Sequence, residues 1–217
     1  ASRNVISGNN STGILMFSSN DAVIEGNYLG LNKAGDAALP NSSEELVLSD
    51  SSGARVGGTT AAERNVIAGN EVANTIVLNG TGTFGTLFQG NYVGLTASGA
   101  TVPQSAQGIV IVSGPHDNTI GGVVAGAGNV LDGSAGAAIF LAGAGNANTI
   151  VGNNIGTNAA GSATGAGFGN AVGIHVVGTN KTLIGSTSPG SGNVIGGSTD
   201  AGIVFESGSQ TNTVIGN

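Results

Sequence analysis

One short pattern, an asparagine followed by two apolar residues, returns along the whole chain and limits its fold more than any other feature. It starts at Asn4, Asn65, Asn129 and Asn193, so successive starts lie 61, 64 and 64 residues apart. A second pattern, Gly-Asn-x-apolar-Gly, returns at nearly the same step. A regular step of this length is typical of repeat architectures, in which each unit buries its apolar side chains only against its neighbours.

Each unit of the repeat divides into two coils of about 32 residues, and each coil carries three short apolar strands. The first strands are anchored by Ile24, Val56, Phe88, Ile120, Ile150, Ile184 and Val214. The second strands are anchored by Ile6, Leu29, Val66, Val93, Val130, Ile155 and Val194. The third strands are anchored by Ile14, Leu46, Ile76, Ile109, Ile139, Ile174 and Ile203. We expect these residues to face inward, and their many β-branched side chains favour strands over helices.

Short strands of this kind cannot bury an apolar side chain at every second position by themselves. Stacking the coils at ~4.8 Å removes the problem, because each strand then pairs with its equivalents above and below in a parallel ladder. The sequence therefore predicts an all-β fold, a right-handed parallel β-helix or β-solenoid with three strands per coil and about seven coils. It predicts a single β-helix domain over residues 1–217, with super-repeats 4–64, 65–128 and 129–192 and a partial one at 193–217.

Glycine and asparagine mark the corners between the expected strands. Glycine makes up 41 of the 217 residues and supplies the positive φ that a tight turn requires. Asparagine recurs at strand starts and strand ends, at Asn9, Asn27, Asn70, Asn91, Asn118, Asn148, Asn153 and Asn212. Because its amide both donates and accepts, equivalent asparagines one coil apart are expected to form hydrogen-bonded ladders. Ordinary turn propensity is the alternative explanation.

The alternation of Asn-Thr-Ile, Gly-Asn-x-Ile and Gly-Ile-x-apolar resembles the right-handed parallel β-helix repeats of the pectate-lyase-like superfamily, including those of bacterial surface proteins. The resemblance covers essentially the whole chain. It implies the fold but no single function, because such repeats serve lyases, hydrolases, epimerases, tailspikes and inert stalks. A carbohydrate-active or carbohydrate-binding β-helix, such as a polysaccharide lyase, hydrolase or epimerase, is therefore the alternative function.

The composition argues against several classes of partner. Charged residues make up 8% of the chain, its five Lys and Arg residues are scattered, and its net charge is −7. Nucleic-acid binding requires a basic stripe, so no nucleic-acid partner is expected. There is no cysteine to form a disulfide or a thiolate metal site, and no apolar run approaches the ~20 residues of a membrane span. We predict no metal, no cofactor and no membrane insertion.

The chain offers few acids for catalysis. In the expected register Glu25 shares its outward column with Gln89 and Val151, so no carboxylate pair forms there. A designed calcium site would need aspartates at a fixed spacing, which the sequence lacks. His175 is expected to be a lone surface histidine, because Phe140 and Val204 occupy the equivalent sites one coil away.

One short motif has a catalytic parallel. Pro115, His116 and Asp117 resemble the Asp-Pro-His-Asp/Glu signature of mannuronan epimerases, which are also β-helices. However, Gly114 stands where the leading acid is expected, and the preceding Tyr-Gly-Phe stretch is absent. The motif therefore predicts a polar turn, and we predict no catalytic residues and no enzyme activity.

The third strands carry an unusual outward column. The residue after each anchor should face out, and six of these seven residues are apolar: Leu15, Val47, Val77, Val110, Phe140 and Val204, with His175 the exception. A solvated face would alternate apolar and polar residues, so this stripe predicts a cover. The cover is either another chain, which makes the stripe a partner-binding surface, or the loops expected in alternate coils at 32–44, 96–108 and 158–173.

The two ends of the chain are complementary in phase. It opens on a second and a third strand and closes on a lone first strand, so the leftover strands add up to one coil. Uncovered coils expose unpaired backbone groups, so a second copy is expected to stack head to tail. The expected end-to-end contact residues are Asn4, Val5, Ile6, Ile14, Val214 and Ile215. The alternative is that the chain is a fragment of a longer solenoid.

These observations together predict a non-catalytic extracellular structural module at a cell surface, forming a fibre or stalk. Its expected partners are further copies of itself, stacked head to tail or packed laterally, and a surface polysaccharide.

Overall fold

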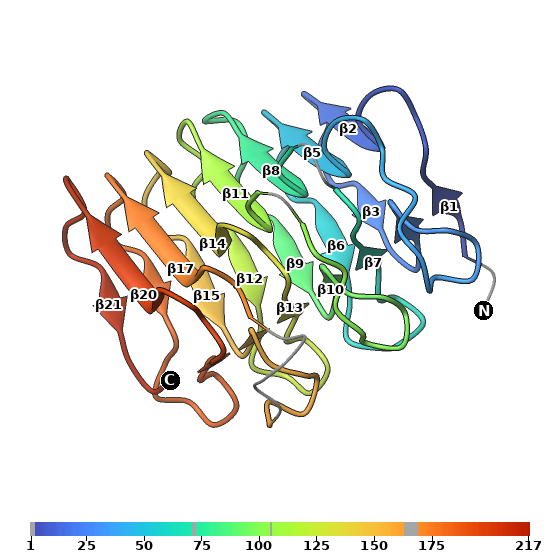
Figure 1. Cartoon of the computed structure of the whole chain (residues 1–217). Helices are drawn as coiled ribbons and strands as arrows, with labels where there is room; N and C mark the ends of the chain where they lie inside the picture. Colours follow the sequence, from blue (N-terminus) through green and yellow to red (C-terminus); the bar gives the residue numbers. More distant parts are fainter. Residues whose placement is uncertain (1–2, 71–72, 105, 163–168) are drawn as a thin grey trace.

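The computed structural model describes residues 3–70, 73–104, 106–162 and 169–217. Within this part of the chain, 21 short strands form three parallel sheets of seven strands each, and no helix is present. Each strand from β1 to β18 pairs with the strand three places further along the chain, so the chain passes once through each sheet before it returns. Figure 1 shows the coils stacked along one axis, with the two termini at opposite ends. The structure confirms the predicted parallel β-solenoid with three strands per coil.

We name the sheets A, B and C. Sheet A contains β1 (Val5–Ile6), β4 (Tyr28–Leu29), β7 (Val66–Ile67), β10 (Tyr92–Val93), β13 (Val130–Leu131), β16 (Asn154–Ile155) and β19 (Val194–Ile195). Sheet B contains β2 (Ile14–Phe17), β5 (Leu46–Ser49), β8 (Ile76–Asn79), β11 (Ile109–Val112), β14 (Ala137–Ala142), β17 (Val172–Val177) and β20 (Ala201–Glu206). Sheet C contains β3 (Val23–Ile24), β6 (Arg55–Gly57), β9 (Leu87–Gln89), β12 (Thr119–Gly121), β15 (Thr149–Val151), β18 (Leu183–Ile184) and β21 (Thr213–Val214).

The inward columns of sheets B and C have the predicted register. In sheet C, Val56 pairs with Ile24 on one side and with Phe88 on the other, and the column continues to Val214. In sheet B the predicted anchors also pair in order, from Ile14 to Ile203. Away from the two ends these side chains are fully buried in one continuous core. Stacking identical positions therefore hides side chains that no single strand could bury.

The predicted register of sheet A is wrong by one residue in every second coil. The inward column runs through Leu29, Ile67, Val93 and Leu131, whereas Val66 pairs with Tyr28 on the outer side. The same correction applies to Val130 and Val194, whose places in the inward column are taken by Leu131 and Ile195. These strands have two residues, both of them apolar, so alternation along the strand cannot decide which one faces inward.

One asparagine ladder runs the full length of the solenoid at the corner between sheets C and A. In each step the side-chain Nδ2 of one asparagine donates to Oδ1 of the next, over 2.7 to 3.1 Å. Its members are Asn4, Asn27, Asn65, Asn91, Asn129, Asn153, Asn193 and Asn217. The predicted ladder is therefore confirmed for Asn27, Asn91 and Asn153. At the corner between sheets B and C, Asn118 likewise donates to Asn148 at 3.1 Å, whereas Asn212 donates to the Thr179 carbonyl. Asn9 and Asn70 are not members, and they bond instead to Asn41 and to the Ser43 carbonyl.

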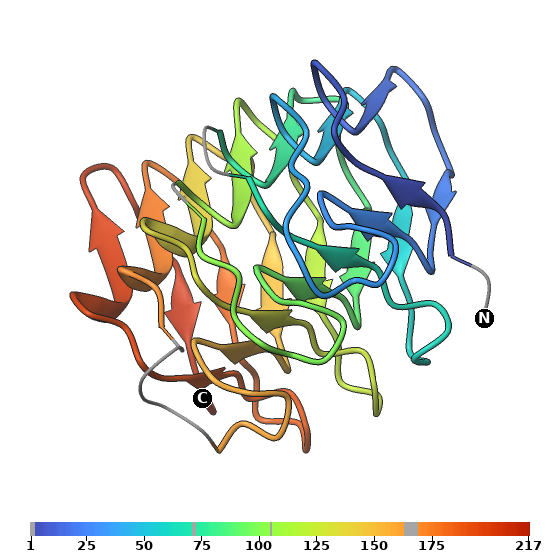
Figure 2. The same cartoon turned by 45° about the vertical axis from the view of Figure 1, so that its right-hand side comes forward.

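Long loops leave two of the three corners in alternate coils, and those between the second and third strands lie where the sequence predicted them. The loops 30–45, 94–108 and 156–171 connect sheet A to sheet B, and the loops 58–65, 122–129 and 185–193 connect sheet C to sheet A. Figure 2 shows long loops projecting from the stack. Both sets flank sheet A, and the corner between sheets B and C has only short turns. The functional surfaces are therefore expected on sheet A or at the ends of the stack.

Candidate functional site

An open groove of about 320 Å³ lies on the outer face of sheet A, between the two sets of loops. Its floor includes Tyr92, Val130 and Asn154, the outward residues of β10, β13 and β16. Arg64 and residues 122–126 of the next loop line one side. Among the described residues that line it, none is acidic. The sequence prediction missed this groove because its walls are loops whose course no strand pattern fixes.

Arginine and tyrosine form a repeated pair on this face. The Arg3 guanidinium lies 5.0 Å from the ring centre of Tyr28, and Arg64 lies 4.1 Å from that of Tyr92. Both distances suit a cation–π contact. In the third super-repeat Gly128 and Asn154 occupy the corresponding positions. The groove opens at this third position, where neither large side chain is present to fill it.

The loops between sheets A and B cover part of the outer face of sheet A. Leu31 and Val102 from these loops form a small apolar cluster with Val66 and Ala68, and the two tyrosines pack against it. Val66 is 2% exposed although it faces away from the main core. The loops were one expected cover for the stripe on sheet B, but Leu31 and Val102 pack on sheet A.

Two buried carboxyl groups lie where these loops join the sheets. Glu45 is fully buried, and it accepts hydrogen bonds from the backbone N–H of Asn41, at 3.1 Å, and from its side-chain amide. Loss of solvation raises the pKa of Glu45 to about 7, although the bonds from Asn41 oppose this rise. Burial likewise raises the pKa of Asp132, which accepts hydrogen bonds from the Thr101 hydroxyl and the Gly169 N–H. The attachment of the loops to sheet A therefore involves groups whose charge depends on pH.

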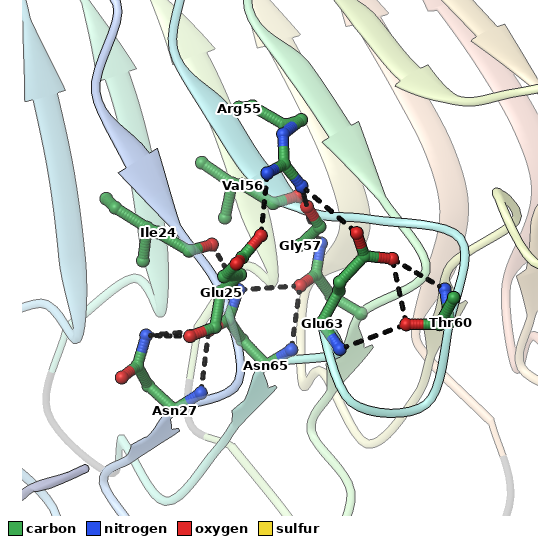
Figure 3. Close-up of polar contacts among 10 residues, drawn as sticks. Ile24, Glu25, Asn27, Arg55, Val56, Gly57, Thr60, Glu63 and Asn65 are labelled. Carbon is green, nitrogen blue, oxygen red and sulfur yellow. Dashed lines mark hydrogen bonds and ion pairs between the residues drawn. The ribbon is translucent and has the colours of Figure 1, made fainter. Parts of the chain in front are cut away.

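The charged residues near the outer face of sheet C pair with one another. Arg55 on β6 lies 2.6 Å from a carboxylate oxygen of Glu25 and 3.8 Å from one of Glu63, and it also donates to the Gly57 carbonyl (Figure 3). Glu63 in turn accepts hydrogen bonds from the backbone and hydroxyl of Thr60, which lower its pKa. Glu25 was expected to form no carboxylate pair within its own column. Its partner is the basic residue Arg55, which lies one coil away and two positions before the equivalent site.

The two histidines have different surroundings. His116 lies on the surface, with Nδ1 2.7 Å from Asp117 and its ring stacked on Phe84 at 5.2 Å. His175 was expected to lack a partner acid, but Glu206 lies 3.3 Å from its Nε2, although not in hydrogen-bonding geometry. Glu206 was not predicted as a partner because it lies one coil away but two residues beyond Val204, the site equivalent to His175.

The outward stripe on sheet B forms the single column that the sequence predicted, from Leu15 through Val47, Val77, Val110, Phe140 and His175 to Val204. Leu15 at its end is 62% exposed, but Val110 in its middle is only 4% exposed. Stacked neighbours thus shield much of the stripe from water. Its role as a partner surface stays a prediction.

The residues predicted for end-to-end contact lie on the two outermost coils. Val5 and Ile6 form β1, and Ile14 begins β2 at one end, while Val214 closes β21 at the other. Val5, Val214 and Ile215 are exposed, and Ile6 and Ile14 are half-buried. Asn4 and Asn217 hold the two ends of the asparagine ladder. The end-to-end contact stays a prediction.

Comparisons of this chain with protein-family models, with curated proteins and with solved structures found no match. What is shown is therefore a parallel β-solenoid with three sheets, and the pectate-lyase-like superfamily stays a resemblance. In the described part of the chain, no helix is long and apolar enough to cross a lipid bilayer. Nor do the described residues include three or more His, Cys, Asp or Glu side chains close enough to hold a metal ion.

Proposed function

We propose that this chain is a non-catalytic structural module of an extracellular surface, and that it builds a fibre or stalk by stacking coils of further copies on its ends. One observation carries the proposal: each inward column is buried by the equivalent residues of the neighbouring coils, so the same contacts would join one copy to the next. In sheet C, Ile184 is fully buried, whereas Val214, the next residue in the same column, is 48% exposed. A further coil would bury Val214 as Val214 itself helps to bury Ile184.

The proposed contact joins two different ends. β1 and β2 of one copy add to β19 and β20 of another, and β21 of that second copy adds to β3 of the first. The backbone groups on the outer edges of these strands then enter parallel ladders like those inside the solenoid. Because the two surfaces differ, the contact does not close on itself, and it propagates into a filament.

The charged residues support a structural role more than a catalytic one. Arg55, Glu25 and Glu63 bind one another, so their charges serve the contacts between neighbouring coils. The alternative of a carbohydrate-active enzyme rests on fold resemblance. Incubation with alginate, pectin and related polymers discriminates between the two, because an enzyme would release unsaturated or reducing products.

Sedimentation velocity across a wide concentration range, with negative-stain microscopy, tests the assembly. We expect the mass to grow with concentration and filaments to form. Val214→Lys places a charge on the end strand and should leave monomers. Val123→Lys is the matched control: Val123 is 53% exposed, but it lies in the loop 122–129, away from both ends, so this variant should assemble like the wild type. A wild type that stays monomeric, or a Val214→Lys variant that assembles normally, contradicts the proposal.

A further inference from the structure

The two arginines that pack on tyrosines use their guanidinium groups differently. Arg3 donates from Nη1 to the Arg64 carbonyl at 2.6 Å and from Nη2 to the Ala61 carbonyl at 3.0 Å. Both terminal nitrogens of Arg3 are therefore occupied by the loop 58–65. Arg64 donates from Nε to the Gly90 carbonyl at 3.0 Å, but its terminal nitrogens have no partner among the described residues.

The position of Arg64 makes these unpaired donors accessible to a ligand. Its guanidinium is held at two points, over the Tyr92 ring and by the Gly90 carbonyl, so it is oriented before any ligand arrives. It lines the groove on sheet A, where the described lining has no carboxylate to neutralise it. The rest of the lining combines the polar Asn154 amide and several glycines with three valines, Val123, Val124 and Val130.

We infer that Arg64 is the anion-binding residue of this groove and that it takes the carboxylate of a small polar molecule. A guanidinium presents two parallel N–H donors that match the two oxygens of a carboxylate. The volume of about 320 Å³ is at the lower end of the range for small-molecule sites, which suits a ligand of about the size of a sugar acid or an acidic amino acid. This inference does not rest on the assembly of the solenoid.

The chain offers a selective readout, because it contains only three arginines, Arg3, Arg55 and Arg64. In ¹⁵N-labelled protein, titration with D-glucuronate or N-acetylaspartate should shift the Nε–Hε signal of Arg64 and leave those of Arg3 and Arg55 in place. The relative response to the two probes distinguishes a sugar acid from an amino-acid ligand. D-Glucose, which has no carboxylate, should give no shift. We expect a Kd on the order of millimolar for these small probes.

Two variants test the assignment: one removes the guanidinium of Arg64, and the other fills the groove but keeps Arg64. Arg64→Gln should weaken glucuronate binding by about tenfold or more, as judged from the backbone amide shifts of residues 122–126, whereas Arg55→Gln should not. Asn154→Tyr restores the tyrosine of the other super-repeats and should abolish binding by filling the groove while Arg64 remains. If neither carboxylate probe shifts the wild type, if glucose binds equally well, or if folded Arg64→Gln binds like the wild type, the inference is wrong.

Discussion

The outer faces of sheets A and B both carry apolar side chains, and these are covered in different ways. On sheet A, loop residues Leu31 and Val102 pack over Val66 and bury it. On sheet B, Val77 of β8 is half-buried between Val47 of β5 and Val110 of β11, which stack on either side of it. An outward apolar residue in a solenoid strand therefore has three possible covers: a loop, its own column, or a partner. Strand patterns alone do not separate them.

The largest expected effect separates the two faces directly. Val66→Asp places an unpaired carboxylate beneath the loops of sheet A and should cost several kcal/mol of unfolding free energy. Val77→Asp changes an outward valine of sheet B whose carboxylate can reach water, and it should cost about 1 kcal/mol or less. Urea unfolding followed by circular dichroism measures both. Similar losses in the two variants would show that sheet B is covered as fully as sheet A.

The sequence predicted most of the fold because side-chain chemistry repeats in register. Val56 and Ile109 could be placed in their inward columns because they recur at a fixed step among polar neighbours. Val66 could not, because Ile67 beside it is equally apolar. A usable signal was nevertheless present: the inward residue of sheet A is always the second residue after a ladder asparagine, as Ile67 is after Asn65.

The groove was less predictable for a physical reason. Arg64 and Tyr92 are 28 positions apart, and they meet only because the loop 58–65 returns to sheet A one coil before β10. The path of a loop depends on its local turns and on the residues that it packs against. It cannot be predicted from columns of equivalent residues, because loop residues do not stack in such columns. The sequence nevertheless carried a signal of the groove. The Arg–Tyr pair recurs in the first two super-repeats, and Gly128 and Asn154 replace it in the third.

A second prediction concerns pH and the cover of sheet A. The folded-state pKa of Glu45 is raised to about 7 from its usual 4.5, so the folded state holds this proton more tightly than the unfolded state. The penalty for ionising buried Glu45 is therefore absent below about pH 4.5, grows as the pH rises, and is complete above about pH 7. It amounts to roughly 3 kcal/mol.

Glu45→Gln isolates this contribution, because it removes the titrating group and keeps a side chain of similar size. The unfolding free energy of the wild type relative to Glu45→Gln should fall between about pH 4.5 and 7, with a flat difference outside that window. Hydrogen exchange should quicken over the same window in the loop 30–45 but not in the strands of sheet B. A pH-independent difference between the two proteins would mean that Glu45 titrates normally and does not control the cover.

The smallest expected effect lies at the corner between sheets B and C, which has no long loops. Positive φ was expected at glycine, yet eight non-glycine residues of the described chain also have positive φ, and all eight lie at this corner. One position there is occupied by Gly85 in one coil and by Ala147 two coils later, with φ of 66° and 60°. A positive φ costs a non-glycine residue about 1 kcal/mol of folded-state free energy relative to glycine. Part of this cost is offset because glycine loses more conformational entropy on folding.

Exchanging the two residues tests whether backbone strain alone sets stability at this corner. Gly85→Ala should lower the unfolding free energy by about 0.5–1 kcal/mol, because an added Cβ meets no heavy atom closer than 3.9 Å and only the conformational cost remains. Ala147→Gly should raise the unfolding free energy by a similar amount, and the melting temperature should shift by about 2 °C in each direction. By contrast, Gly94→Ala at a corner of sheet A would make Cβ clash with the Asp132 carbonyl oxygen, so it should cost several times more. Equal losses for Gly85→Ala and Gly94→Ala would contradict the idea that the corners beneath the loops are packed more tightly than the bare corner.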